Sequence, residues 1–234
     1  MSKKRETRQA PPPQTKHYLP FIIIAVVLVA AVAVGAWLWR SARKSSGTGA
    51  VAVGAPGAQP PHASGRENAP LTLEEFGDYQ CPPCGNAYPE VEKIRTDYGD
   101  KLRFIFRQYP LTQAHQSALV AAHAAEAAGV QGKFWEMHDR LFRTQRDWSK
   151  DANPRAIFET YASAIGLDLE RFKRDMDSAE VDARIVADHE RGNSLGVKST
   201  PTFFLNGREL PADKLQTPTD LRSFLDAALA GKSF

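Results

Sequence analysis

The sequence predicts an α/β fold, a short mixed sheet with an all-helical insertion, preceded by one N-terminal transmembrane helix. Three observations lead to this prediction. A charge-free apolar run covers residues 21–39. Period-two strand patterns occur at residues 71–76 and 102–107 and return only at residues 202–210. Between the second and third patterns, apolar residues recur every three or four positions, which is typical of helices.

Charge is unevenly distributed along the chain. The 234 residues carry 30 Lys and Arg against 27 Asp and Glu, yet residues 1–44 hold 8 of the cations and 1 of the anions. Residues from 45 onward therefore hold 22 cations and 26 anions, so this part is mildly acidic. A nucleic-acid-binding protein needs a basic patch that neutralises phosphates, and we expect no nucleic acid as a partner.

The apolar run predicts a transmembrane helix over residues 18–39, after a basic tail of residues 1–17. Tyr18 and Trp39 stand at its ends, where aromatic rings favour the two membrane interfaces. The alternatives are a buried core helix and a cleaved signal peptide, but a signal peptide has a shorter apolar run followed by small residues. Because five Lys and Arg precede the run and three follow it, we expect a single-pass anchor with a cytoplasmic N-terminus.

Residues 40–69 are rich in Gly, Ala, Ser and Pro without apolar periodicity, and they predict a flexible linker. Residues 70–234 then form one domain, long enough for a single core. In its first strand pattern, Glu75 lies on the same face as Leu71 and Leu73, because side chains alternate along a strand. We therefore expect a carboxylate that points inward.

A helix is predicted to begin at Pro82, a residue suited to the first helical position, and to end before Gly99. Its apolar positions place Cys84 on the buried face, one turn into the helix. Cys81 stands at the helix tip, where free backbone N–H groups and the helix dipole favour an anion. The two cysteines are therefore expected in different environments.

The remaining elements follow from periodicity and turn residues. The helical insertion covers about residues 113–196, and Asn206-Gly207 between two short strand patterns is a strong hairpin signal. The expected helices are Ser117–Ala128, Gly132–Arg143, Pro154–Ala164, Leu169–Asp175, Val181–Leu195 and Thr219–Leu229, and the expected hairpin strands are Thr202–Leu205 and Arg208–Leu210.

The chain has two cysteines, Cys81 and Cys84, separated by two prolines. As a structural disulfide they would close a very small loop, which stabilises a fold by only about 2 kcal/mol. As a zinc site they supply half of the four ligands, and His115 and His123 would have to complete it. A dithiol that cycles with its disulfide uses the helix tip, the buried thiol and the short loop together. We expect this redox function, with no metal and no other cofactor.

Three stretches of the chain, taken in order, resemble the DsbA-like thiol:disulfide oxidoreductases, a branch of the thioredoxin-like fold. They are EFGDYQCPPC from Glu75 to Cys84, the helical block, and GVKSTPTFFLNG from Gly196 to Gly207. The resemblance covers about residues 71–232. It implies a thioredoxin-like fold with an all-helical insertion.

The resemblance also implies roles for particular residues. Cys81 would be the exposed nucleophile and Cys84 the resolving thiol of a redox-active disulfide. Pro201, by itself an ordinary trans proline at the start of a strand, would instead be cis and face the cysteines. Glu75 would assist proton movement at the buried thiol. Substrate would contact three residues, namely Thr200, Pro201 and Pro82.

The implied function is oxidation of substrate protein thiols outside the cytoplasm. Strongly oxidising members usually carry Pro-His between the cysteines, whereas this chain has Pro82-Pro83. A disulfide reductase or isomerase therefore stays an alternative, as does a non-catalytic module that binds a metal or a peptide. The expected partners are extracytoplasmic proteins with Cys and a membrane redox partner that resets the disulfide.

Overall fold

The computed structural model describes residues 54–215 and 217–233. The predicted basic tail and transmembrane helix lie outside the described residues, as does the predicted linker up to residue 53. Among the helices of the described ranges, none is both long and apolar enough to cross a bilayer.

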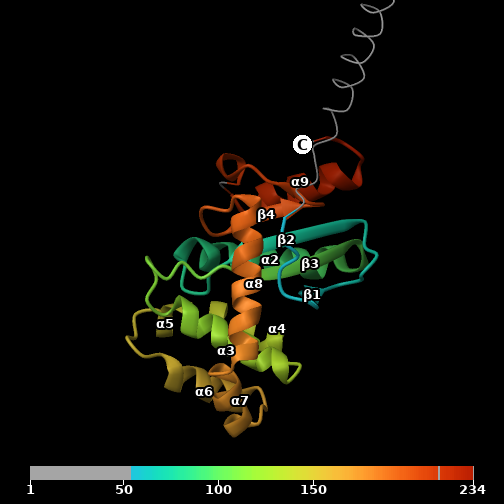
Figure 1. Ribbon diagram of the computed structural model, residues 1–234. Helices are drawn as coiled ribbons and strands as arrows, with labels where there is room; N and C mark the ends of the chain where they lie inside the picture. Colours follow the sequence, from blue (N-terminus) through green and yellow to red (C-terminus); the bar gives the residue numbers. More distant parts are fainter. Residues whose placement is uncertain (1–53, 216, 234) are drawn as a thin grey trace, which may run out of the picture. The chain divides into compact units, whose positions relative to one another are not determined.

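The domain is built on a mixed sheet with the strand order β1-β3-β2-β4-β5 (Figure 1). β2 and β3 run parallel, and Glu75 of β2 is opposite Phe106 of β3. β4 pairs antiparallel with β2 on its other side, and β1 pairs antiparallel with β3. The strands are β1 (His62–Ser64), β2 (Leu71–Gly77), β3 (Leu102–Gln108), β4 (Thr202–Leu205) and β5 (Arg208–Glu209).

β2 is the central strand and is buried on both faces. Leu73 belongs to the main apolar cluster, together with residues of helix α2 (Pro82–Tyr98). Phe76 belongs to a second cluster with Tyr109, Val197 and Phe204. Adjacent positions of β2 are therefore both out of water. For this reason Glu74 and Glu75, one on each face, are only 5% and 3% exposed.

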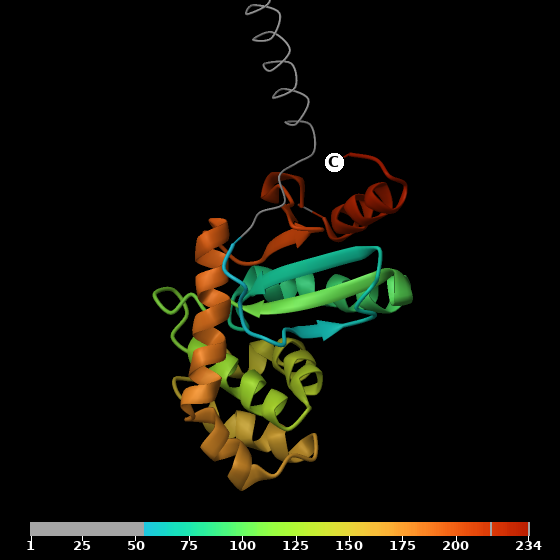
Figure 2. The same ribbon diagram turned by 45° about the vertical axis from the view of Figure 1, so that its right-hand side comes forward.

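The helical insertion joins β3 to β4 and lies on the β1 side of the sheet, with helix α9 (Pro218–Leu229) on the β4 side (Figure 2). The alanine-rich α3 contacts α4, α7 and α8, because its small side chains let helices approach closely. α8 then brings the chain back to the sheet. The inserted helices are α3 (Ala118–Val130), α4 (Phe134–Arg143), α5 (Gln145–Trp148), α6 (Arg155–Ala164), α7 (Leu169–Met176) and α8 (Ala179–Leu195).

Residues 54–69 belong to the folded domain, which corrects the predicted flexible linker. His62–Ser64 form β1, and Ala58 is buried. The Ala58 N–H donates to the Asp188 carboxylate at 2.8 Å, and the Arg107 guanidinium donates to the Ala58 carbonyl at 3.0 Å. The segment is thus held by polar side chains of distant elements. Because polar contacts rather than a buried apolar face hold this segment, its sequence lacks the apolar periodicity from which a buried element is predicted.

Within residues 54–215 and 217–233, the predicted helices and strands occur within two residues of their expected bounds, and the structure adds elements that were not predicted. One of these is the four-residue helix α5, which lies in a polar stretch. Trp148 anchors it, because this side chain is fully buried and its indole N–H donates to the Leu141 carbonyl at 2.9 Å. So short a helix shows no repeat of apolar positions from which it could be predicted.

Candidate active site

The two cysteines stand at the start of α2. Cys81 is the N-cap residue, with an extended backbone, Pro82 is the first helical residue and Cys84 lies in the first turn. Both cysteines are free thiols. Cys84 is fully buried, as expected, but Cys81 is only 4% exposed, which corrects the expectation of an exposed nucleophile. The segment before β4 covers its sulfur.

That segment contains Thr200 and Pro201. The Cys81 thiol donates a hydrogen bond to the Thr200 carbonyl, with an Sγ···O distance of 3.3 Å. The Thr200–Pro201 peptide bond is cis, as the resemblance implies. The fold therefore brings together the first cysteine and the cis proline segment, although 119 positions separate Cys81 from Thr200.

The two thiols differ in acidity. A hydrogen bond from the Cys84 thiol lowers the pKa of Cys81 to about 6, against the opposing effects of burial and of the negative charge of Asp78. Burial raises the pKa of Cys84 well above its ordinary value, and the charge of Glu75 acts in the same direction. Cys81 is thus suited to be a thiolate at neutral pH, and Cys84 a thiol.

Glu75 lies close to both cysteines in the buried interior. Burial raises the pKa of its carboxyl to about 8, which the positive charge of Arg95 on α2 partly opposes. The carboxyl is therefore mostly protonated at neutral pH. A neutral acid beside the buried Cys84 can exchange a proton with that thiol, which agrees with the role that the resemblance implies.

Asp78 is an important residue of the site that the sequence analysis missed. Its Oδ1 accepts from the Gln80 N–H at 2.7 Å, and its Oδ2 accepts from the Leu111 N–H at 2.9 Å and pairs with His115 Nδ1 at 2.7 Å. Its carbonyl accepts from the Cys81 N–H at 3.1 Å. Strand and helix periodicity give no signal for a buried carboxylate in a loop. Its only signal is its position between the strand and Cys81.

The histidines considered as zinc ligands lie in separate places. His115 precedes α3 and pairs with Asp78, whereas His123 lies within α3 and pairs with Asp182 at 2.7 Å. Across residues 54–215 and 217–233, no group of three or more His, Cys, Asp or Glu side chains could hold a metal ion.

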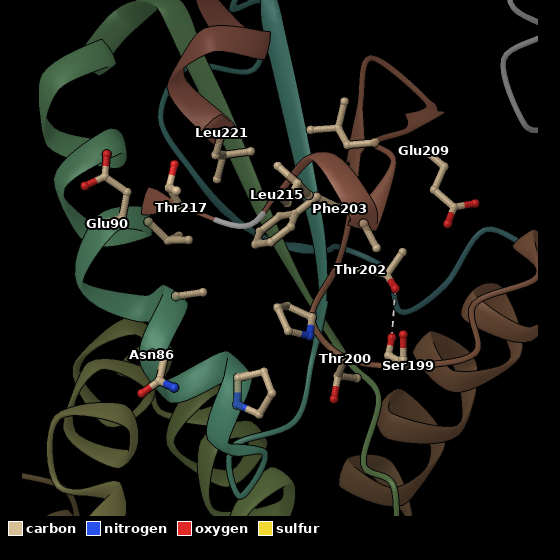
Figure 3. Close-up of a pocket in the computed structure, with 16 residues that line it drawn as sticks. Asn86, Glu90, Ser199, Thr200, Thr202, Phe203, Glu209, Leu215, Thr217 and Leu221 are labelled. Carbon is tan, nitrogen blue, oxygen red and sulfur yellow. Dashed lines mark hydrogen bonds between the residues drawn. The ribbon is translucent and has the colours of Figure 1, made fainter. Parts of the chain in front are cut away.

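A cavity of about 480 Å³ adjoins the cis proline segment. Figure 3 shows Thr200 on one side of it and Asn86 of α2 on the other. The predicted substrate residues Thr200 and Pro201 line the cavity, but exposed Pro82 does not, and Pro83 takes its place. The walls are mostly apolar, and the apolar lining residues include Ala87, Val91, Phe203, Leu210, Leu215 and Leu221.

Glu74, on the opposite face of β2, is part of a buried ionic network. Its Oε1 accepts from Arg107 and from Arg191, both at 2.7 Å, and Arg107 also donates to Asp188 at 2.9 Å. Burial alone would raise the pKa of Glu74, but its hydrogen bonds to the two arginines lower it. The two adjacent glutamates therefore differ in chemistry, one being ion-paired and the other neutral at pH 7.

Comparison with known proteins agrees with this architecture. The family model described as thioredoxin matches residues 58–227. The chain belongs to the thioredoxin family. A solved thioredoxin-like oxidoreductase from Silicibacter pomeroyi DSS-3 is 30% identical, with a TM-score of 0.60 over 72% of this chain and 91% of that chain.

Two further solved structures share the fold at lower identity. Oxidised BdbD from Bacillus subtilis is 24% identical, with a TM-score of 0.64 over 77% of this chain and 99% of that chain. The thiol-disulfide exchange protein α-DsbA2 from Wolbachia pipientis is 23% identical, with a TM-score of 0.60 over 70% of this chain and 84% of that chain. The predicted thioredoxin-like fold with a helical insertion is confirmed.

Curated relatives carry a different name. The chain is 38% identical over 175 residues to Na(+)/H(+) antiporter NhaA 1 of Mycolicibacterium gilvum (strain PYR-GCK), which covers 73% of this chain and 26% of that protein. This chain spans about a quarter of the length of the curated relatives that it matches. Most of each antiporter therefore has no counterpart in the match.

Proposed function

We propose that this thioredoxin-family chain is a membrane-tethered thiol:disulfide oxidoreductase that oxidises the thiols of substrate proteins outside the cytoplasm. The observation that carries the oxidising direction is the difference in acidity between the two thiols. The pKa of Cys81 is lowered to about 6, whereas that of Cys84 is raised. Stabilising the Cys81 thiolate stabilises the reduced enzyme, which makes its disulfide a stronger oxidant.

The proposed reaction begins with the Cys81–Cys84 disulfide. A substrate thiolate attacks Cys81 Sγ, which forms a mixed disulfide and breaks the bond to Cys84. Because the pKa of Cys84 is high, it is a poor leaving group unless it receives a proton. Glu75, whose pKa is raised to about 8, is protonated at neutral pH and is suited to supply that proton.

In the second step, the other thiolate of the substrate attacks the substrate sulfur of the mixed disulfide. Cys81 leaves as a thiolate, which its lowered pKa favours. The substrate departs with a disulfide, and the two electrons stay on the dithiol of Cys81 and Cys84. A membrane redox partner must then remove these electrons for another cycle.

The substrate is proposed to bind along Thr200 and Pro201 as an extended segment. The cavity beside these residues has mostly apolar walls, which suits an apolar side chain of an unfolded protein. The Thr200 carbonyl lies 3.3 Å from Cys81 Sγ in the free protein. A bound segment would therefore meet the nucleophilic sulfur next to the backbone that it pairs with.

The tether is proposed from the apolar run of residues 18–39 and its basic flanks. An extracytoplasmic location is supported by the chemistry, because protein disulfides persist outside the reducing cytosol. The substrates would be extracytoplasmic proteins with pairs of Cys.

The direct test is the redox equilibrium of the purified full chain with glutathione, together with its ability to oxidise a reduced, unfolded protein. We expect the equilibrium to favour the reduced enzyme, and one substrate disulfide to form for each chain. Cys81→Ser should abolish oxidation. An equilibrium that favours the oxidised enzyme, with reduction or reshuffling of substrate disulfides, would instead support a reductase or isomerase. A pair that does not exchange with glutathione would indicate a non-catalytic module.

A further inference from the structure

We propose that Gln145, a residue of the helical insertion, is a positioning residue. It holds residues 79–81, the loop that carries Cys81. The proposal rests on the proposed thiol exchange at Cys81 and adds to it a residue from outside the thioredoxin core. Two kinds of observation carry it. One is a set of hydrogen bonds between the loop and the insertion, and the other is a close approach to Gly85.

The Gln145 side chain fastens two carbonyls of the loop. Its Nε2 donates to the Tyr79 carbonyl at 2.8 Å and to the Cys81 carbonyl at 2.9 Å, so both of its protons are used. The Cys81 carbonyl also accepts the Gly85 N–H at 3.1 Å, at the start of α2. One amide group thus holds both the loop and the beginning of the helix.

The amide packs directly against the backbone of α2. A Cβ added to Gly85 would lie 2.2 Å from Oε1 of Gln145 and 2.7 Å from its Cδ. Glycine weakens a helix interior relative to alanine, so a glycine in the first turns of α2 needs a reason. The reason here is space, because any larger residue at this position would displace the Gln145 amide.

Gln80, within the loop, also forms hydrogen bonds with the helical insertion. Its Nε2 donates to the Ser149 carbonyl at 2.7 Å, and its Oε1 accepts from the Ser117 N–H at 2.6 Å. Ser149 follows α5 and Ser117 precedes α3, so the loop is bonded to two places in the insertion. Residues 79–81 therefore make four hydrogen bonds with the helical insertion.

This attachment matters for the chemistry because the Cys81 sulfur must keep its place beside two partners. Its thiol lies 3.3 Å from the Thr200 carbonyl, and the Cys84 thiol stabilises its thiolate. A loop that is free to shift would weaken both contacts.

The first test compares alkylation of Cys81 in the reduced, purified full chain with that in Gln145→Ala, across a range of pH and with mass spectrometry to identify the modified residue. At pH 6 we expect alkylation to slow by about 3- to 10-fold, an effect of the size that ordinary hydrogen bonds contribute. The matched control is Gln131→Ala. Gln131 also holds two backbone groups, the N–H of Asp168 at 3.0 Å and its carbonyl at 3.2 Å, but it does so between α3 and α7. Its loss should leave Cys81 unchanged.

The second test is Gly85→Ala, which separates positioning from stability. Helix propensity alone predicts a more stable α2 and an unchanged thiol. The proposal predicts slower alkylation, as in Gln145→Ala, because the new Cβ displaces the amide. The double variant should be no slower than either single variant. Unchanged alkylation in Gln145→Ala, or effects of the two changes that multiply, would overturn the proposal.

The outcomes also separate this proposal from the proposed function. A wild-type chain that fails to oxidise substrate would reject the oxidase function, whereas alkylation of Cys81 would still report how the loop is held. Conversely, the wild-type chain could be a fully active oxidase while Gln145→Ala leaves the alkylation rate of Cys81 unchanged. That result would reject only the positioning role.

Discussion

The Cys81 thiol donates a hydrogen bond to the Thr200 carbonyl across 3.3 Å, although 119 positions separate the two residues along the chain. Thr200 directly precedes the cis proline Pro201, and both line the cavity in which a substrate segment is proposed to bind. The nucleophile and the proposed substrate contact are therefore adjacent. Substitutions in this region should thus change both thiol exchange at Cys81 and substrate binding.

The first prediction concerns the two thiols. Alkylation of Cys81 should rise with pH about a midpoint near pH 6, because its pKa is lowered to about 6, while Cys84 stays nearly unreactive. Cys84→Ser should accumulate mixed disulfides through Cys81, since the resolving thiol is absent. Equal reactivity of the two thiols, measured by mass spectrometry after brief alkylation, would contradict this mechanism.

The second prediction concerns the stability contributed by Glu75. Its folded pKa of about 8 lies above the ordinary value of 4.5, so the folded state holds this proton more tightly than the unfolded state does. Stability from this group is therefore present at acid pH and is lost as pH rises from about 4.5 to 8. Relative to wild type, Glu75→Gln should gain about 4 kcal/mol of unfolding free energy between pH 4 and pH 8. Denaturant unfolding at the two pH values measures this gain, and an equal difference at both would contradict it.

The third prediction concerns the neighbouring Glu74, whose replacement by Gln should destabilise the fold, in contrast to Glu75→Gln. Glu74→Gln removes the carboxylate that pairs with the buried Arg107 and with Arg191. Leaving buried Arg107 and partly buried Arg191 without this carboxylate should destabilise the fold by about 3 kcal/mol at neutral pH. Substrate oxidation at low temperature should be unaffected, because the network lies on the other face of β2. A stabilised Glu74→Gln chain would show that the network is not ion-paired as described.

The fourth prediction concerns Asp78, whose negative charge opposes ionisation of Cys81. Asp78→Asn should raise the thiolate fraction of Cys81 at pH 5 by about 2- to 5-fold, which thiolate absorbance can measure. The redox equilibrium should shift toward the reduced enzyme. Asp182→Asn is the matched control, because it removes a carboxylate from another His–Asp pair, that with His123. A lower thiolate fraction in Asp78→Asn would mean that loss of loop structure outweighs loss of charge.

The fifth prediction tests the membrane topology. Protease added to spheroplasts that express the full chain should digest the domain, because the charge flanks of residues 18–39 predict a cytoplasmic N-terminus. A cytoplasmic marker protein must survive in the same sample. Digestion that requires lysis of the membrane would reject the orientation and weaken the oxidase proposal with it.

Much of the fold could be predicted from local sequence. Pro82 and Gly99 delimit α2, and Asn206-Gly207 gives the hairpin, because caps and turns act over a few residues. Predictions were less accurate where distant residues supply the stabilising contacts. β1 lay hidden in the predicted linker, since its segment is held by Asp188 and Arg107 rather than by an apolar repeat of its own.

The sequence by itself determined the two cysteines, their different positions at the start of α2 and the inward direction of Glu75. Each of these follows from the period of one helix or one strand. The tertiary structure alone decided that the Thr200 carbonyl covers Cys81, that Asp78 is buried against His115 and that Gln145 holds the loop. These contacts join residues far apart along the chain. Local periodicity carries no record of such partners, because they meet only when the sheet and the helical insertion pack together.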